Sequence, residues 1–145
     1  MATIAQVLKA KGTREVYSIA PDETVYEAVR KMSEHNVGAL LVMDGASIVG
    51  IVTERDYARK MVLAGRSSKE TPVSTIMTPE VLCVTPRQTT EECMAIMTRH
   101  RVRHLPVLDH ERLVGLVSIG DLVKDIISEQ QFIIEQLEHY IAGSR

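Results

Sequence analysis

The chain has 145 residues, of which 45% are hydrophobic and 25% charged, and its formal net charge is −2 at pH 7. This length and composition are typical of one ordinary globular domain, and the balanced charge excludes a field that would recruit nucleic acid or an anionic membrane. Its apolar runs are too short to span a bilayer and none follows the basic start of a signal peptide, so we expect a cytoplasmic protein.

The hydrophobic pattern of the first half predicts a regular order of elements, in which a polar linker from Arg66 to Thr71 precedes Pro72. Apolar residues at helical spacing alternate with short apolar runs that end at turn residues. The predicted elements are a helix at 2–12, a strand at 16–19, a helix opened by a capping box at Thr24 and Glu27, a hairpin with strands at 37–43 and 48–52, and a helix from Asp56 to about Ala64.

The second half predicts the same order, but its last helix does not stop where the first one did. The predicted elements are a strand at 81–84, a helix at 90–100, strands at 102–108 and 113–117, and a helix from Gly120 whose apolar stripe continues to Ile141. A stripe of this length favours packing on another chain, and folding back on its own domain is the alternative.

An internal duplication explains this order. The stretch IVGIVTERD, ending at Asp56, returns as LVGLVSIGD, ending at Asp121, and the same offset of 65 residues superimposes the chain from Val16 to Val62 without a gap. The short segment before each repeat is also duplicated, but at an offset of 69: Ile4, Val7 and Leu8 match Val73, Ile76 and Met77. We therefore expect two half-domains that share one core.

The repeated unit resembles the cystathionine-β-synthase-type (CBS) domain pair, also called a Bateman module. Residues 73–79 (VSTIMTP) are similar to the opening segment of that family, residues 101–107 (RVRHLPV) to its second strand, and residues 115–121 (GLVSIGD) to its exit. The first half departs from the pattern at Gly38, Ala39 and Leu41. The resemblance covers nearly the whole chain apart from the extended last helix.

The resemblance implies an α/β (α+β) fold of two β-α-β-β-α repeats packed with pseudo-twofold symmetry, plus an extended C-terminal helix. We expect a first repeat with its N-terminal helix and linker at 1–71, a second repeat at 72–128 and a helical extension at 129–145. It also implies clefts between the repeats that bind an adenosyl ligand such as AMP, ADP, ATP, NAD or S-adenosylmethionine, a regulatory role without a catalytic cofactor, and a homodimer.

Asp56 and Asp121 are expected in the first turn of a helix, where free backbone N–H groups and the helix dipole favour an anion. A carboxylate there could accept hydrogen bonds from the two vicinal hydroxyls of a ribose. The alternative is that Thr53-x-x-Asp56 is only a capping box, which needs no ligand. The plainer caps of this chain use Glu, and we expect the shorter Asp to reach its own cap N–H less well and to face a cleft instead.

Carried over by position, the resemblance implies two ligand sites, each shared between the repeats. Asp56 and Thr53 would hold ribose and phosphate in one, and Asp121 and Ser118 in the other. The remaining candidates are Leu82, Cys83 and Val102 around the first base, Tyr17, Ser18, Val37, Gly38 and Ala39 around the second, and Arg55, Arg103 and His104 for phosphate. For these cations, the alternative is a solvated strand edge or a salt bridge to Glu54 or Asp109.

Three functions are weighed. A nucleotide sensor would transmit its occupancy to a separate, unknown regulated protein, whereas a structural dimerisation module would keep vestigial clefts. An enzyme is not expected, because the sequence shows no nucleophile paired with a base and no phosphate loop of the G-x-x-x-x-G-K type. No metal site is expected either, because Cys83 and Cys93 lack a CxxC spacing or a His at ligand spacing.

Overall fold

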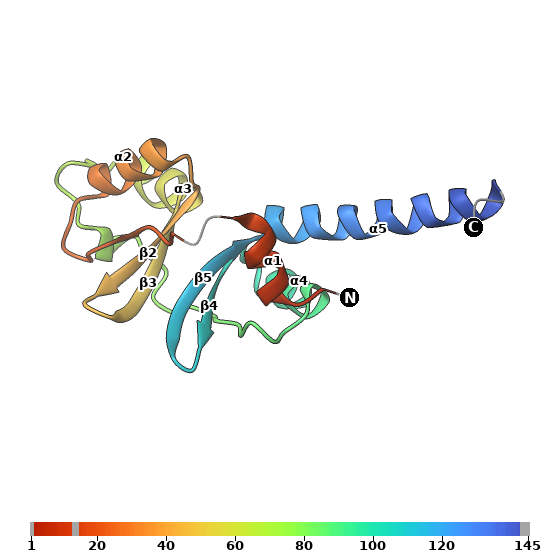
Figure 1. The fold of residues 1–145 in the computed structure, drawn as a ribbon. Coiled ribbons are helices and arrows are strands. Elements are labelled where there is room, and N and C mark those ends of the chain that lie inside the picture. Colours follow the sequence, from red (N-terminus) through yellow and green to blue (C-terminus); the bar gives the residue numbers. More distant parts are fainter. Residues whose placement is uncertain (1, 13–14, 143–145) are drawn as a thin grey trace. The chain divides into compact units, whose positions relative to one another are not determined.

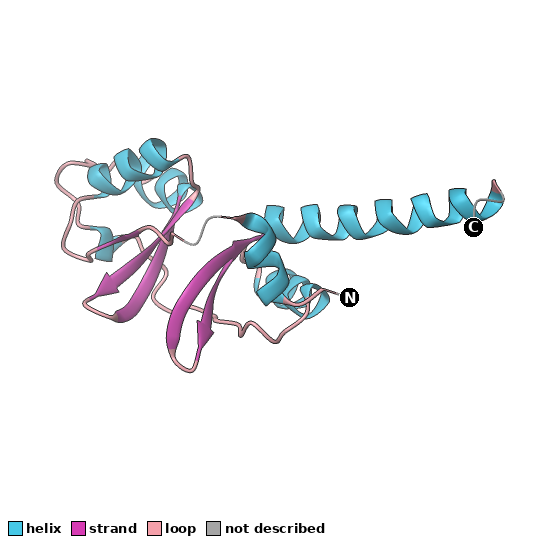
Figure 2. Cartoon of the chain, in the orientation of Figure 1, coloured by secondary structure: helices cyan, strands magenta, loops and turns pink. Residues whose placement is uncertain are grey.

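The computed structural model describes residues 2–12 and 15–142 (Figure 1). The chain divides into two compact units, one formed by Glu15–Leu82 and the other by residues 1–14 together with 83–145. Each unit contains one β-hairpin with helices beside it (Figure 2). Residues 1, 13–14 and 143–145, which fall in the predicted first repeat and in the predicted C-terminal extension, lie outside the described residues.

The unit formed by Glu15–Leu82 contains a three-stranded sheet in the order β1-β2-β3. The strand β1 (Ser18–Ile19) is parallel to β2 (Ala39–Asp44), and β2 is antiparallel to β3 (Ser47–Thr53). Three helical segments accompany the sheet, and the buried core between them is aliphatic with Met as filler. These segments are α2 (Val25–His35), α3 (Glu54–Asp56) continued by the π-helical turn η1 (Tyr57–Val62), and the 3₁₀ turn η2 (Val73–Thr75).

The other unit contains a two-stranded sheet of β4 (His104–Asp109) and β5 (Arg112–Ser118), which pair antiparallel. Its helices are α1 (Ile4–Lys11), α4 (Thr90–His100) and α5 (Ile119–Ile141). The mixed α/β fold with two hairpins and a long C-terminal helix, expected from the sequence, is thus confirmed.

The predicted strand at 81–84 is wrong except for one bridge, in which Val84 pairs parallel with Val107. The repeat itself gives the reason. In the first unit, the N–H of Leu41 donates to the carbonyl of Tyr17 over 3.2 Å. The equivalent of Leu41 is Pro106, which has no N–H, so the ladder cannot form at that point.

The two duplicated lead-in segments, Ile4–Leu8 and Val73–Met77, have exchanged places relative to the order of the chain. Ile4–Leu8 belongs to the unit of the second repeat, where the N–H of Ile4 donates to the carbonyl of Gln88 over 2.8 Å. Val73–Met77 belongs to the unit of the first repeat, where the N–H of Val73 donates to the carbonyl of Glu23, also over 2.8 Å. The predicted boundary at 71/72 assigns each lead-in segment to the repeat that follows it in the chain. The compact units instead place each segment with the other repeat.

Glycines in the hairpins make room for these segments. A Cβ on Gly50 would lie 2.6 Å from the sulfur of Met77 and 3.0 Å from the main-chain oxygen of Thr78. A Cβ on Gly115 would lie 2.7 Å from Cδ2 of Leu8. Each repeat therefore needs glycine where the lead-in segment crosses its last strand.

Helix caps follow the sequence closely, with one difference. The Thr89 hydroxyl accepts from the N–H of Glu92 while the Glu92 carboxylate accepts from the N–H of Thr89, so the predicted box is complete. At Thr24 only half of the box forms, because Glu27 instead accepts a 2.8 Å hydrogen bond from Arg30.

The helix α5 starts in the core of its unit at Leu122 and then carries exposed apolar side chains towards its C-terminal end. Charged residues interrupt this stripe, and no helix in the described part of the chain is long and apolar enough to cross a membrane. The exposed members of the stripe are Val123, Ile127, Phe132, Ile133, Ile134, Leu137, Tyr140 and Ile141.

We predict that Gly50→Ala lowers the free energy of unfolding by about 1–3 kcal/mol, because the added methyl group would meet the main-chain oxygen of Thr78, which cannot rotate away. Gly115→Ala should cost less, because it meets the tip of the flexible Leu8 side chain. Urea denaturation of both variants measures the difference. Adding Leu8→Ala should relieve Gly115→Ala, and equal costs at the two glycines would contradict the role of the Thr78 backbone.

Candidate functional site

Asp56 lies in the first turn of α3, where β3 becomes helical. Thr53 is the N-cap, and its hydroxyl accepts from the N–H of Asp56 over 3.1 Å. Oδ2 of Asp56 accepts from the N–H of Thr53 over 3.0 Å and from its hydroxyl over 3.2 Å. Oδ1 lies 3.2 Å from the ammonium of Lys60, one helical turn further on. The carboxylate is thus held at the end of the strand by bonds to both oxygens.

Asp121 occupies the equivalent place at the start of α5. The Ser118 hydroxyl accepts from the N–H of Asp121 over 3.2 Å, and Oδ2 of Asp121 accepts from the N–H of Ser118 over 2.9 Å. The same Oδ2 lies 3.0 Å from the ammonium of Lys11, which comes from α1. The Asp121 side chain remains 20% exposed, against 13% for Asp56.

The expectation that these aspartates reach their own caps less well than glutamate does is wrong. Both Asp56 and Asp121 form complete reciprocal capping boxes, whereas Glu27 does not. The residues after each N-cap are already helical, so the N–H of the N-cap residue points towards the side chain three positions later. The short aspartate side chain is long enough to accept from this N–H. The capping box therefore describes the local geometry of both aspartates, and a ligand role has to be compatible with it.

Sequence reasoning missed the two lysines beside these carboxylates. Lys60 could have been found, because it lies four residues after Asp56 on one helix face, a spacing that brings side chains together. Lys11 gave no such signal, because it lies 110 residues before Asp121 in the chain. Only the exchange of the lead-in segments brings it there.

The structure brings several predicted site residues of the first unit together at the end of its hairpin. Ala39 pairs with Thr53, and the carbonyl of Gly38 accepts from the N–H of Glu54 over 3.1 Å. Ser18 lies on the neighbouring β1. Tyr17 stacks on His35, with ring centroids 3.9 Å apart, while Val37 packs against the core.

The first unit also places Glu54 here, an acidic residue that the sequence offered only as a salt-bridge partner for the cations. A Cβ on Gly38 would lie 3.3 Å from Oε1 of Glu54, so this carboxylate covers the small residue that was expected to leave room for a base. Arg55 follows Glu54 in the same turn, and Leu82 ends the unit with 39% of its surface exposed.

The second unit gathers its predicted residues in the same way. His104 pairs with Ser118 across the hairpin, and the carbonyl of Arg103 accepts from the N–H of Ile119 over 2.9 Å. Val102 packs against the core, and Cys83 is exposed. That each ligand site is shared between the repeats stays a prediction.

Burial lowers the pKa of His104 below its ordinary value of 6.5, and the nearby Lys11 lowers it further, while Asp121 opposes the shift. The imidazole is therefore neutral at pH 7, and the positive charge beside Asp121 comes from Lys11 and Arg103.

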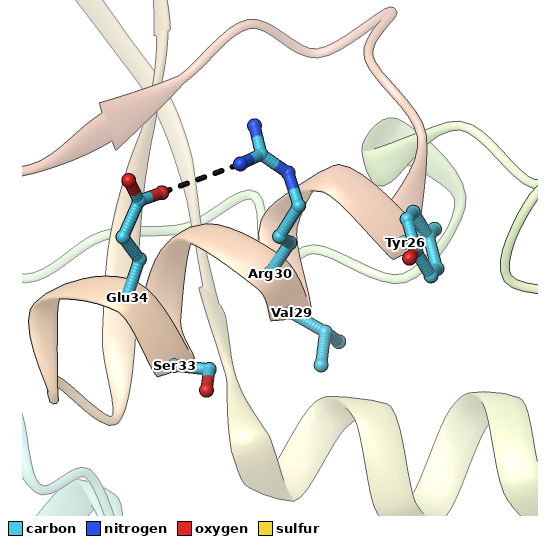
Figure 3. Close-up of a pocket in the computed structure, with 5 residues that line it drawn as sticks. All are labelled: Tyr26, Val29, Arg30, Ser33 and Glu34. Atoms are coloured by element: carbon cyan, nitrogen blue, oxygen red, sulfur yellow. Dashed lines mark hydrogen bonds and ion pairs between the residues drawn. The ribbon is translucent and has the colours of Figure 1, made fainter.

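One other surface feature is not part of this arrangement. A hollow on the outer face of α2 is lined by Tyr26, Val29, Arg30, Ser33 and Glu34, and its Arg30 is paired with Glu34 (Figure 3). None of the predicted site residues lines it. The residues that the structure describes contain no group of three His, Cys, Asp or Glu side chains that could hold a metal ion.

Comparison with known proteins agrees with this geometry. The family model of the CBS domain matches twice, at residues 6–63 and 73–128. The chain belongs to the CBS domain family. Each match ends after one of the two strand-to-helix aspartates, so the duplicated sites are the equivalent parts of two CBS domains in tandem.

Relatives of this CBS pair are similar over most of its length. The CBS domain-containing protein CBSX3, mitochondrial, of Arabidopsis thaliana is 43% identical, and the match covers 97% of this chain and 72% of the relative. A solved structure of a protein with CBS domains, named for signal transduction, from Burkholderia ambifaria MC40-6 is 57% identical with a TM-score of 0.86, covering 89% of this chain and 96% of that one.

One further solved structure carries ligands. It is the CBS domain pair of protein MJ0100 in complex with 5′-methylthioadenosine and S-adenosyl-L-methionine, with a TM-score of 0.76 over 89% of this chain and 98% of that one. At 21% identity it shows that the fold is shared.

The lowered pKa of His104 makes the stability of the CBS pair depend on pH. In the unfolded chain this histidine takes up a proton as the pH falls through about 6.5, whereas the folded form resists it, so the free energy of unfolding should fall with pH below that value. We expect His104→Gln to lose this dependence. Urea denaturation between pH 5 and pH 8 measures it, and identical pH profiles for the two proteins would contradict it.

Proposed function

We propose that this CBS pair is a regulatory, non-catalytic protein that senses adenine nucleotides. It binds AMP, ADP, ATP or NAD(H) with the carboxylates of Asp56 and Asp121 and transmits occupancy to a separate regulated protein that remains to be identified. The observation that carries the proposal is the duplicated carboxylate, held at a strand-to-helix turn in each unit by the same capping box.

The capping box positions the carboxylate and leaves some of its hydrogen-bond acceptor sites open. Two carboxylate oxygens offer about four lone-pair sites, and the box at Asp121 takes one of them through the N–H of Ser118. The remaining sites could accept from the vicinal hydroxyls of a ribose. Because the cap fixes the side-chain rotamer in advance, binding would lose little side-chain entropy.

The ligand-binding residues that we propose lie around these two carboxylates. They are shared between hairpin ends, helix starts and the neighbouring turns of both repeats, with small or apolar residues for the base and cations for phosphate. They are Tyr17, Ser18, Val37, Gly38, Ala39, Thr53, Arg55, Asp56, Leu82, Cys83, Val102, Arg103, His104, Ser118 and Asp121.

The ligand class is supported by the fold. The CBS pair of MJ0100, which has the same fold, holds two adenosyl compounds. An adenosyl ligand would act as a signal only through unequal affinity for two arrangements of the protein, one of which the regulated partner recognises. The cytoplasmic location stays a prediction, and the name of the Arabidopsis relative assigns that protein to the mitochondrion.

A second function, a structural dimerisation module, is favoured by α5. Ile127, Phe132 and Ile134 are each about half exposed or more, and Tyr140 and Ile141 are 82% exposed. Such a stripe on a soluble chain is costly unless another surface covers it. We propose that it forms a homodimer with the same stripe of a second copy. This proposal is compatible with nucleotide sensing.

Ligand binding is tested with a thermal-shift panel of AMP, ADP, ATP, NAD, NADH and S-adenosylmethionine. A ligand at 100 times its Kd should add about 2.7 kcal/mol of stability to the folded protein. Protein first shown to be free of copurified nucleotide that responds to no member of the panel would overturn the proposal.

The site is tested by Asp56→Asn and Asp121→Asn, measured by calorimetric titration. Asparagine keeps a side-chain oxygen for the cap N–H but lacks the charge, so each variant should weaken its own site by roughly 1–3 kcal/mol while folding normally. Asp109→Asn, which removes an exposed carboxylate paired with Arg87, is the matched control. Unchanged affinity in both site variants would leave the aspartates as caps alone.

The dimer is tested by ending the chain after Ile127, which removes most of the exposed stripe and keeps the buried Leu122. We expect light scattering to show one chain per particle, against two for the full chain. Ile134→Glu with Leu137→Glu should do the same at full length, because like charges and buried polar groups oppose a helix pair. A particle that keeps its number of chains in both variants would exclude pairing through α5.

A further inference from the structure

Lys11 is the residue that most distinguishes the Asp121 site from the Asp56 site. Its ammonium donates to Oδ2 of Asp121 over 3.0 Å and to the carbonyl of Leu116 over 3.1 Å, and 31% of its side chain remains exposed. It is held by two acceptors of one hairpin end and still reaches solvent.

The duplication did not produce this contact. At the offset of 69 that relates the lead-in segments, the equivalent of Lys11 is Glu80. At the offset of 65 that relates the repeats, the equivalent of Lys60, which pairs with Asp56, is Asp125. The two aspartates are thus equivalent, but their lysines are not. Each aspartate is therefore paired with a lysine from a different part of its unit.

The two lysines leave their carboxylates in different states. Lys60 takes Oδ1 of Asp56 while the Thr53 cap takes Oδ2, so both oxygens have partners. Lys11 shares Oδ2 of Asp121 with the Ser118 cap, and Oδ1 has no hydrogen-bond partner among the described residues. Asp121 can therefore accept two hydroxyls at Oδ1 while Lys11 stays in place, whereas at Asp56 the ammonium of Lys60 already occupies one of the two lone-pair sites of Oδ1.

The surrounding charges also differ. Around Asp121 the cations are Lys11 and Arg103, both of which act on His104, and the neutral histidine adds no charge at pH 7. Around Asp56, the cations Arg55 and Lys60 are balanced by two carboxylates, that of Glu54, which lies over Gly38, and that of Asp56 itself. Among the charged groups that act on His104, Lys11 and Arg103 exceed the carboxylate of Asp121 by one positive charge.

We propose that Lys11 makes the Asp121 site selective for phosphorylated adenosyl ligands, with its ammonium bound to the phosphate while Asp121 holds the ribose. The inference rests on the proposed function. An ammonium has three N–H donors, of which two are engaged here, and its flexible stem lets it follow a phosphate without leaving the carboxylate unpaired. The same charge disfavours a cationic adenosyl compound such as S-adenosylmethionine.

The test compares AMP with adenosine, which differ only in the phosphate, by calorimetric titration in the Asp56→Asn background so that the Asp121 site is measured. Lys11→Met should weaken AMP by on the order of tenfold and leave adenosine within about twofold, because a charge-assisted contact is lost from the phosphate alone. Lys11→Arg keeps the charge and should retain the preference for AMP. Lys9→Met, in the same last turn of α1, is the matched control and should bind as the parent does.

An unchanged ratio of AMP to adenosine affinity in Lys11→Met would overturn the inference and leave the proposed function standing. Equal strengthening of both ligands would overturn it too, because Lys11 would then be a competitor for Asp121. If the Asp56→Asn parent binds neither ligand, the inference fails, and the thermal-shift panel on the unaltered protein decides the proposed function separately. Lys11→Gln replaces the Met variant if circular dichroism shows that the latter does not fold.

Discussion

The close approach of a lead-in segment to a glycine in the last strand of each hairpin is the constraint on which both units depend. Met77 crosses Gly50 and Leu8 crosses Gly115 at distances that no Cβ would allow. Because Met77 and Leu8 are partly buried against the two cores, these close contacts fix where each lead-in segment lies. That position in turn supplies the carbonyl of Ile76 to Lys60, over 3.0 Å, and brings Lys11 to Asp121. Packing in the core thus decides the electrostatics at the candidate sites.

The capping role of the aspartates and their proposed ligand role, which the sequence presents as alternatives, are compatible with each other. A capping box stabilises a helix start by about 1 kcal/mol and needs no ligand, yet it also holds a carboxylate rigidly at a helix N-terminus. At Asp121 the box leaves Oδ1 open among the described residues. In the proposed site, different oxygens of one side chain would then serve local stability and ligand recognition. At the equivalent Asp56, the neighbouring Lys60 occupies Oδ1 instead. The identity of one neighbouring lysine thus determines which carboxylate oxygen stays open.

Much of the fold could be predicted because the relevant signals are local. The hairpins, the caps at Thr53 and Ser118 and the glycine turns all depend on residues a few positions apart. The repeat aligns Pro106 with Leu41, and a proline has no N–H to donate to a neighbouring strand. Pro106 alone therefore argues against the predicted strand at 81–84. The exchange of lead-in segments could not be predicted, because Ile4–Leu8 and Val73–Met77 have the same apolar spacing and fit either hairpin. Lys11 followed from that exchange and was missed with it.

The exchange also has a consequence for the order in which the chain can fold during synthesis. The hairpin of the first repeat is complete once Thr53 has been made. The core of that unit is not complete until Val73, which is fully buried in it, has also been made. Ile4, also fully buried, must wait for the strand that ends at Ser118. The segment Ile4–Leu8, which is made before the hairpin that it packs on, is therefore among the last to reach its place, and until then an apolar helix face stays open on the nascent chain. Neither repeat, cut from the other at the linker, would carry its own complete core.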